Sequence, residues 1–127
     1  MRITKDEIPA TIDAPGAVAR QLGDFGAAPK GALAAEYLSL GAGVDIAPLL
    51  QGLEGNACQA PHWGYVIEGH VVVSYADGTQ DECRTNDLVY WPSGHSVRVV
   101  DDTELVLFSP HLEHAAVMDH MRVQMGL

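Results

Sequence analysis

The chain has 127 residues, of which 47% are hydrophobic and 19% charged, a composition typical of a single globular domain. Seven basic against 17 acidic residues give a net charge of −10, which disfavours nucleic acid and anionic membrane surfaces as partners. No apolar run reaches the roughly 18 residues that span a bilayer. With no export signal and only two cysteines, we expect a cytoplasmic protein with free thiols.

The first thirty residues differ from the rest of the chain in their sequence pattern. Residues 1–30 contain three prolines and three glycines and show little periodicity, which predicts an extended arm with short pieces of strand. Its isolated apolar residues predict docking either on the body of the chain or on a neighbouring subunit; they are Ile8, Val18, Leu22 and Phe25.

Residues 34–109 are dominated by short β-strand patterns separated by turns. Asp77-Gly78 is typical of a hairpin turn, and Asp101-Asp102 is interpreted as the turn of a further hairpin. The predicted strands are 36–40, 64–68, 70–75, 79–84, 88–91, 96–100 and 104–109. Strands of this length at this spacing predict an all-β fold, a small antiparallel barrel or sandwich.

The last segment changes to a helical pattern. After Pro110, apolar residues recur at roughly helical spacing, which predicts a short C-terminal helix over residues 111–125. We expect this helix to cover one end or edge of the barrel. The arm, the barrel and the helix together form one domain over residues 1–127.

The segment from Asn56 to Asp101 resembles the two signature motifs of the cupin superfamily. Those motifs read Gly-x5-His-x-His-x3,4-Glu-x6-Gly and Gly-x5-Pro-x-Gly-x2-His-x3-Asn. Residues 65–69, Tyr-Val-Ile-Glu-Gly, are similar to the end of the first motif, and Pro92 and Gly94 match the second. Residues 58–69 and 90–95 are also similar to a group of small bacterial cupin-domain proteins. The resemblance implies an antiparallel cupin-type β-barrel, or jelly roll.

The metal positions of the cupin motifs are mostly altered in this sequence. Aligned on Gly69, His62 stands at the family's glutamate, and Cys58 stands at its second histidine. In the second motif, Val97 stands at the histidine and Asp101 at the asparagine. The resemblance therefore supports the fold more strongly than it supports the chemistry.

A different set of residues is a candidate for holding a metal. The cupin scaffold places His62 and His95 near the mouth or interior of the barrel, and His95 shares a strand face with Val97. Cys58 precedes His62 by four residues, so both side chains face inward if the segment is extended. Cysteine with two histidines suits zinc, and histidine pairs also suit iron or nickel. The alternative is that Cys58 is a buried hydrophobic residue and that the histidines make ordinary hydrogen bonds.

Four aromatic residues flank the same motifs. We expect pocket-lining residues among Trp63, Tyr65, Tyr90 and Trp91, although aromatic side chains also fill barrel cores. Because side chains alternate along a strand, only one of Tyr90 and Trp91 faces the pocket, and the sequence does not distinguish them.

The remaining acidic and histidine residues are interpreted as solvated. Glu36, Asp45 and Glu54 are each read as part of a solvent-facing strand or loop, and a metal-ligand or general-base role is the alternative. His111, His114 and His120 are read as a solvated helix surface.

Three functions remain open at the level of the sequence. The first is a metal-dependent enzyme acting on a small molecule held in the barrel, with His62 and His95 as metal ligands. The second is a metal-free cupin that binds or senses a small molecule without catalysis, and the third is a purely structural dimer module. In each case we expect a homodimer, with the arm of residues 1–30 in its interface, because an open barrel leaves strand edges free and two-fold dimers are common.

Overall fold

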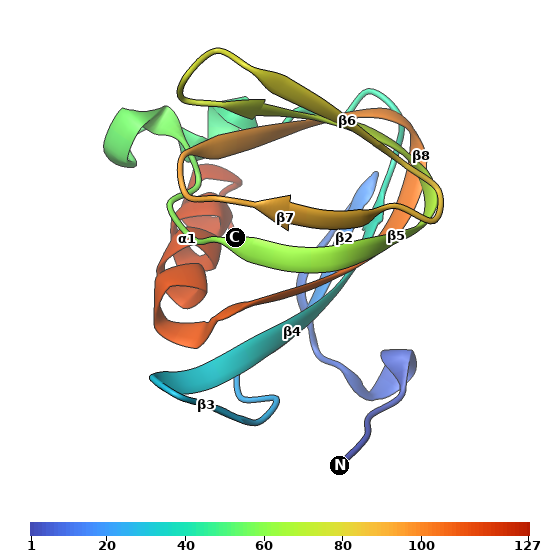
Figure 1. The fold of residues 1–127 in the computed structure, drawn as a ribbon, viewed down its shortest axis with the longest axis vertical. Coiled ribbons are helices and arrows are strands. Elements are labelled where there is room, and N and C mark those ends of the chain that lie inside the picture. The colour runs from blue at the N-terminus through green and yellow to red at the C-terminus, as the bar shows by residue number, and fades with distance from the viewer.

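The computed structural model describes residues 1–127 as one eight-stranded antiparallel sheet followed by one α-helix. Neighbouring strands run in the order β1 (Ala10–Ala14), β2 (Ala17–Leu22), β4 (Gly31–Leu40), β8 (His95–Pro110), β5 (His62–Tyr75) and β6 (Gln80–Arg84). The short strand β3 (Ala27–Ala28) pairs with β4, and β7 (Leu88–Trp91) pairs with β5. The sheet folds over so that β2 and β4 lie opposite β5, β6 and β7, with β8 curving between the two layers (Figure 1). The antiparallel β-barrel expected from the sequence is confirmed.

The N-terminal arm is more regular than expected. Strands β1 and β2 form a hairpin around Gly16, whose φ of +78° suits the turn. Strand β2 then pairs with β4 from Ala17 opposite Leu40 to Leu22 opposite Ala35. Of the two placements left open by the sequence, the structure has the arm on the body of its own chain.

Strand β8 corrects one prediction. Residues 96–109 were expected to form a hairpin around Asp101 and Asp102, but β8 runs without a turn through both aspartates and stays paired with β5 along its length. Neither aspartate has the positive φ that a tight hairpin turn needs. The strand instead bends at an irregular register beside Gly69 of β5, where the second half of β8 also begins to pair with β4.

The inner faces of the strands fill the barrel. Nine buried residues form the main core, contributed chiefly by alternate positions of β5 and β8, such as Val66, Val73, Val99 and Leu105. Such alternation leaves the neighbouring side chains on the outer face of the sheet.

The helix α1 (His111–Gln124) begins directly after Pro110, as expected. It lies at one end of the barrel, between the layer that contains β4 and the short 3-10 helix Ala47–Leu50 (Figure 1). Its buried side chains are His114, Val117 and Met118. The helix therefore closes the open end of the barrel. None of the helices has the length and apolar character needed to cross a membrane.

Candidate metal and ligand site

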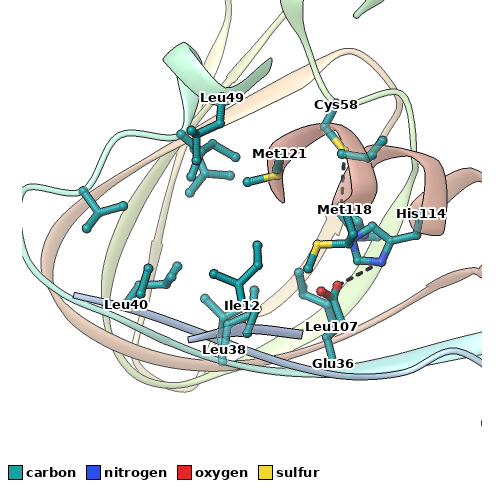
Figure 2. A pocket seen from close by; sticks show the side chains of 18 of the residues that line it. Ile12, Glu36, Leu38, Leu40, Leu49, Cys58, Leu107, His114, Met118 and Met121 are labelled. Atoms are coloured by element: carbon teal, nitrogen blue, oxygen red, sulfur yellow. Dashed lines mark hydrogen bonds and ion pairs between the residues drawn. The ribbon is translucent and has the colours of Figure 1, made fainter. Parts of the chain in front are cut away.

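A cavity of about 100 Å³ lies between the inner face of the barrel and α1. Seventeen of its 21 lining residues are hydrophobic, and the four others are Glu36, His62, His95 and His114. Figure 2 shows aliphatic side chains such as Leu38 and Leu40 on one side of the cavity, and Glu36, His114 and Cys58 on the other. The cavity thus has an apolar end and a polar end.

The structure brings the predicted pair of histidines together. His62 is the first residue of β5 and His95 the first of β8; both are buried, and their ring centroids lie 4.9 Å apart. Cys58 is held next to them by an antiparallel bridge to His95, in which its backbone N–H donates to the carbonyl of His95 at 2.8 Å. The expectation that the two imidazoles approach each other inside the barrel is confirmed.

Hydrogen bonds orient both imidazoles. Nδ1 of His95 lies 2.8 Å from the carbonyl oxygen of Pro92, which only accepts, so Nδ1 carries the proton and Nε2 keeps its lone pair. Nδ1 of His62 is hydrogen-bonded to the hydroxyl of the buried Ser109. Nε2 of His62 lies 3.6 Å from Sγ of Cys58.

These atoms fit a metal ion. One donor atom from each of Cys58, His62 and His95 lies within 4.8 Å of the others. Bond lengths of about 2.3 Å to sulfur and 2.0–2.1 Å to nitrogen place the two donors roughly 3.6 Å apart on a tetrahedral zinc ion. The observed 3.6 Å between Cys58 Sγ and His62 Nε2 matches that separation.

Two further residues of the polar end were misread in the sequence. The sequence predicts solvent-facing side chains for Glu36 and His114, but both are buried. Glu36, His62 and His114 form a second group of donor atoms within 4.8 Å of one another. The ring centroids of His62 and His114 lie 4.8 Å apart. His62 therefore belongs to both groups.

The contact between Glu36 and His114 leaves a carboxyl oxygen unused. Oε1 of Glu36 lies 3.1 Å from Nδ1 of His114 without the alignment of a hydrogen bond, and this buried oxygen has no hydrogen-bond partner. Nδ1 of His114 instead accepts a hydrogen bond from the amide of Gln21 at 3.3 Å. An unpartnered buried oxygen is costly, and a cation or a ligand hydroxyl would satisfy it.

Burial keeps the whole cluster uncharged at neutral pH. It raises the pKa of Glu36 to about 8 and that of the Cys58 thiol to about 12. It also lowers the pKa of His114 to about 4 and holds the pKa values of His62 and His95 below their usual range. Glu36 and His114 are therefore a neutral pair rather than an ion pair.

The aromatic residues divide between the two faces of the sheet. Trp91 is buried and lines the cavity, whereas Trp63, Tyr65 and Tyr90 are exposed on the outer face and do not line it. The reason is register: His62 pairs with Trp91 and both point inward, so their neighbours Trp63 and Tyr90 point outward, where their rings stack 5.3 Å apart. This corrects the expectation that the outer three contribute to the pocket.

Other candidates lie outside the cavity. Asp45 and Glu54 are exposed, as expected. Nε2 of His120 lies 2.7 Å from the carbonyl oxygen of Gln51 and so ties α1 to the loop before β5. Cys83 is a buried free thiol of the main core.

The chain is thus a small antiparallel β-barrel with a largely apolar cavity and a buried polar cluster at one end of that cavity. No protein-family model matches the sequence, and no curated protein is similar to it. Among solved structures, an ectoine synthase from P. lautus matches with a TM-score of 0.64 at 16% identity, over 94% of this chain and 84% of that one. A RmlC-like cupin from Shewanella frigidimarina matches with a TM-score of 0.59 at 16% identity, over 89% and 93%.

A larger protein contains the same barrel. A variant of the oxalate decarboxylase of Bacillus subtilis matches with a TM-score of 0.59 at 21% identity, over 84% of this chain but only 28% of that one. These likenesses show that the chain has the cupin fold, which the motifs around Gly69 and Pro92 predicted.

Proposed function

We propose that the chain is a metal-dependent cupin enzyme that acts on a small molecule bound in the barrel. Its metal ligands are His62 and His95, with Cys58 as the third. The observation that carries the proposal is the convergence of these three buried donors on one end of an otherwise apolar cavity. Thiolate with two imidazoles favours Zn²⁺ over iron or nickel.

The residues around this site have distinct tasks. A metal ion held by Cys58, His62 and His95 would supply a Lewis acid and an activated water at the polar end of the cavity. Pro92 and Ser109 hold the two imidazole rings through their Nδ1 atoms. Glu36 keeps a proton on its carboxyl group and has an unpartnered oxygen beside the site, so it is placed to donate to or accept from a ligand hydroxyl. Trp91 and the aliphatic wall exclude bulk water.

Metal analysis of the purified protein tests the proposal. We expect close to one equivalent of zinc per chain, lost in His62→Ala and bound at least tenfold more weakly in Cys58→Ser. In protein reconstituted with Co²⁺, the thiolate-to-metal absorption band should disappear in Cys58→Ser. His70→Ala, which alters a histidine outside the cavity, is the matched control.

The other results have defined meanings. Loss of metal in Glu36→Gln but not in Cys58→Ser would move the site to the second donor group, Glu36, His62 and His114. A chain that binds neither added Zn²⁺ nor Co²⁺ would refute the metal centre. Circular dichroism of each variant separates loss of metal from loss of the fold.

The second candidate function is a metal-free cupin that binds or senses a small molecule. The lining of the cavity favours it, because 17 of its 21 residues are hydrophobic and can hold an apolar ligand without a cation. The metal analysis above separates the two candidates.

We also propose that the protein acts as a cytoplasmic homodimer. Since β1 and β2 belong to the chain's own sheet, the arm offers a second copy only the free edge of β1. The outer face of β5 and β7 offers a larger surface, where exposed apolar side chains lie side by side.

A further inference from the structure

The lining of the cavity restricts the charge of its ligand. No lysine or arginine lines it, and its one carboxyl group, Glu36, is buried beside His114. A phosphate or dicarboxylate would leave water without a cationic side chain to replace its hydration, and an ammonium group would exchange its hydration for a lining in which 17 of 21 residues are hydrophobic. The chain's own residues therefore disfavour charged ligands.

The distribution of polarity restricts the ligand's shape. The polar side chains of the lining gather around His62 and His114, whereas Leu40 lies on the opposite side of the cavity (Figure 2). Val44 lies next to Gly16, whose neighbour Ala17 pairs with Leu40, so it belongs to the same apolar end. A ligand that satisfies both ends carries one polar group and an apolar body.

The helix α1 adds an adaptable wall to the apolar body of the cavity. Met118 and Met121 of α1 line the cavity together with Met125, which directly follows the helix. Methionine is unbranched and polarizable, so it adjusts to ligands of different outline. The wall therefore selects apolar bodies by volume more than by exact shape.

The volume sets the ligand's size. A cavity of about 100 Å³ is far larger than the roughly 15 Å³ that one water needs, and it is somewhat smaller than the about 150 Å³ cavity known to hold benzene. This corresponds to a ligand of about six to eight non-hydrogen atoms.

We infer that the ligand is a small uncharged amphiphile, with one oxygen-bearing group at the polar end and an aliphatic body at the apolar end. The inference deepens the proposed function and rests on it only for the metal beside the polar group. It separates this chain from the oxalate decarboxylase that shares its fold, since a dicarboxylate has no apolar body to place against Leu40 and Val44.

The two tryptophans of the chain provide a direct test. Trp91 is buried in the cavity wall, and Trp63 is exposed on the outer face, so the variant Trp63→Phe leaves Trp91 as the single fluorescent reporter of the cavity. The probes are 1-hexanol, hexanoate, hexylammonium and succinate, titrated at pH 7 into protein freed of metal by chelation and into protein loaded with Zn²⁺.

We expect 1-hexanol to alter Trp91 fluorescence saturably in both forms. In the metal-free form it should bind at least tenfold more tightly than hexanoate or hexylammonium, and succinate should not bind. Val44→Phe, which fills the apolar end, should weaken 1-hexanol binding at least tenfold. The matched control Ile67→Phe enlarges an exposed side chain of the outer face and should leave binding unchanged.

The experiment tests the proposed metal centre and the proposed ligand class separately. If the chain binds 1-hexanol but takes up no metal, the proposed metal centre is refuted and the proposed ligand class stands. Uptake of zinc, with tighter binding of succinate or hexylammonium than of 1-hexanol to metal-free protein, would overturn the ligand class and leave the metal centre intact. No binding of 1-hexanol, or equal binding by Val44→Phe, would also overturn the ligand class.

Discussion

His62 is the residue on which both donor groups of the polar end depend. It stands between Cys58 and His95 on one side and Glu36 and His114 on the other. A substitution of His62 therefore disrupts both donor groups. Cys58→Ser disrupts only the group with His95, and Glu36→Gln disrupts only the group with His114. The geometry makes these two variants more informative than His62→Ala about which atoms bind a cation.

The buried carboxyl group of Glu36 predicts an unusual pH dependence of stability in metal-free protein. Its pKa rises from 4.5 to about 8, so the folded state keeps a proton that the unfolded chain releases. Its stabilising effect is complete below pH 4.5 and is lost as the pH rises through 8. Burial lowers the pKa values of the three cavity histidines, whose effect is opposite but is already complete just above pH 6.5.

Between pH 7 and 8, the histidines are neutral in the folded state and lose only their last fraction of charge in the unfolded chain, so Glu36 dominates. We expect the free energy of unfolding to fall by roughly 0.5–1 kcal/mol across this interval. Urea unfolding at pH 7.0, 7.5 and 8.0 with chelator present measures it, and Glu36→Gln should abolish the fall. An equal slope in the variant, or a flat wild-type profile, would show that Glu36 is ionised in the folded state.

The sequence predicted one half of the polar cluster and missed the other for a physical reason. His62, His95 and Cys58 lie in segments whose spacing matches known motifs, so their direction follows from the fold. Glu36 lies in a strand with apolar residues on both faces, which hides the direction of its side chain. His114 precedes the buried Val117 and Met118 by three and four residues, and this shared helix face was the available signal.

At the scale of elements, the long strands β5 and β8 depend on a close approach at Gly69. Its φ is +123°, and an added Cβ would lie 2.6 Å from the backbone carbonyl oxygen of Asp102 and 2.3 Å from Oγ1 of Thr103. Thr103 in turn accepts a hydrogen bond from the N–H of His70 at 3.1 Å. A side chain at residue 69 would therefore push the two strands apart at their bend.

The variant Gly69→Ala should show this cost. Gly78 is the matched control, because its φ is also positive, +86°, but nothing lies within 4 Å of an added Cβ. We expect Gly78→Ala to lower the free energy of unfolding by about 1 kcal/mol and Gly69→Ala by roughly 3 kcal/mol or more. Denaturant unfolding of both measures the difference, and equal losses would mean that the bend tolerates a side chain.

The bend in β8 also explains why the predicted hairpin turn at Asp101 and Asp102 was wrong. Glycine and turn residues correctly marked Gly78, but two adjacent aspartates at 101 and 102 were read as a turn because they are polar and interrupt an apolar run. In the structure they remain in β8, exposed at the bend, where Oδ1 of Asp102 accepts a hydrogen bond from the N–H of Ala42 at 2.8 Å. Polarity marks exposure, whereas a two-residue hairpin turn also requires positive φ.

At the scale of the whole molecule, the outer face of β5 and β7 has more exposed apolar surface than a solvated sheet needs. Five side chains are 37–84% exposed there and neighbour one another through the strand register: Trp63, Tyr65, Ile67, Leu88 and Tyr90. Together they expose about 500 Å² of largely apolar surface. A standard interface buries about 800 Å² per partner, so this outer aromatic face is large enough to form its apolar centre.

A second copy of the chain is the occupant that we propose for the outer aromatic face. Each copy has a net charge of −10, so an association between copies must be driven by an uncharged apolar patch, and this face provides one. A two-fold axis through the face would pair the same aromatic side chains of both copies. A lysine placed there would be buried opposite its own symmetry mate.

We therefore expect Leu88→Lys to convert a homodimer into a monomer in light scattering at micromolar concentration. Leu112→Lys is the matched control, since Leu112 is 79% exposed on α1 and Leu88 is 84% exposed on β7, and it should stay dimeric. Far-ultraviolet circular dichroism should be unchanged in both, because neither side chain is buried. A monomeric wild-type chain would refute the dimer, and a dimer that survives Leu88→Lys would transfer the interface to the free edge of β1, the place that the arm alone can offer.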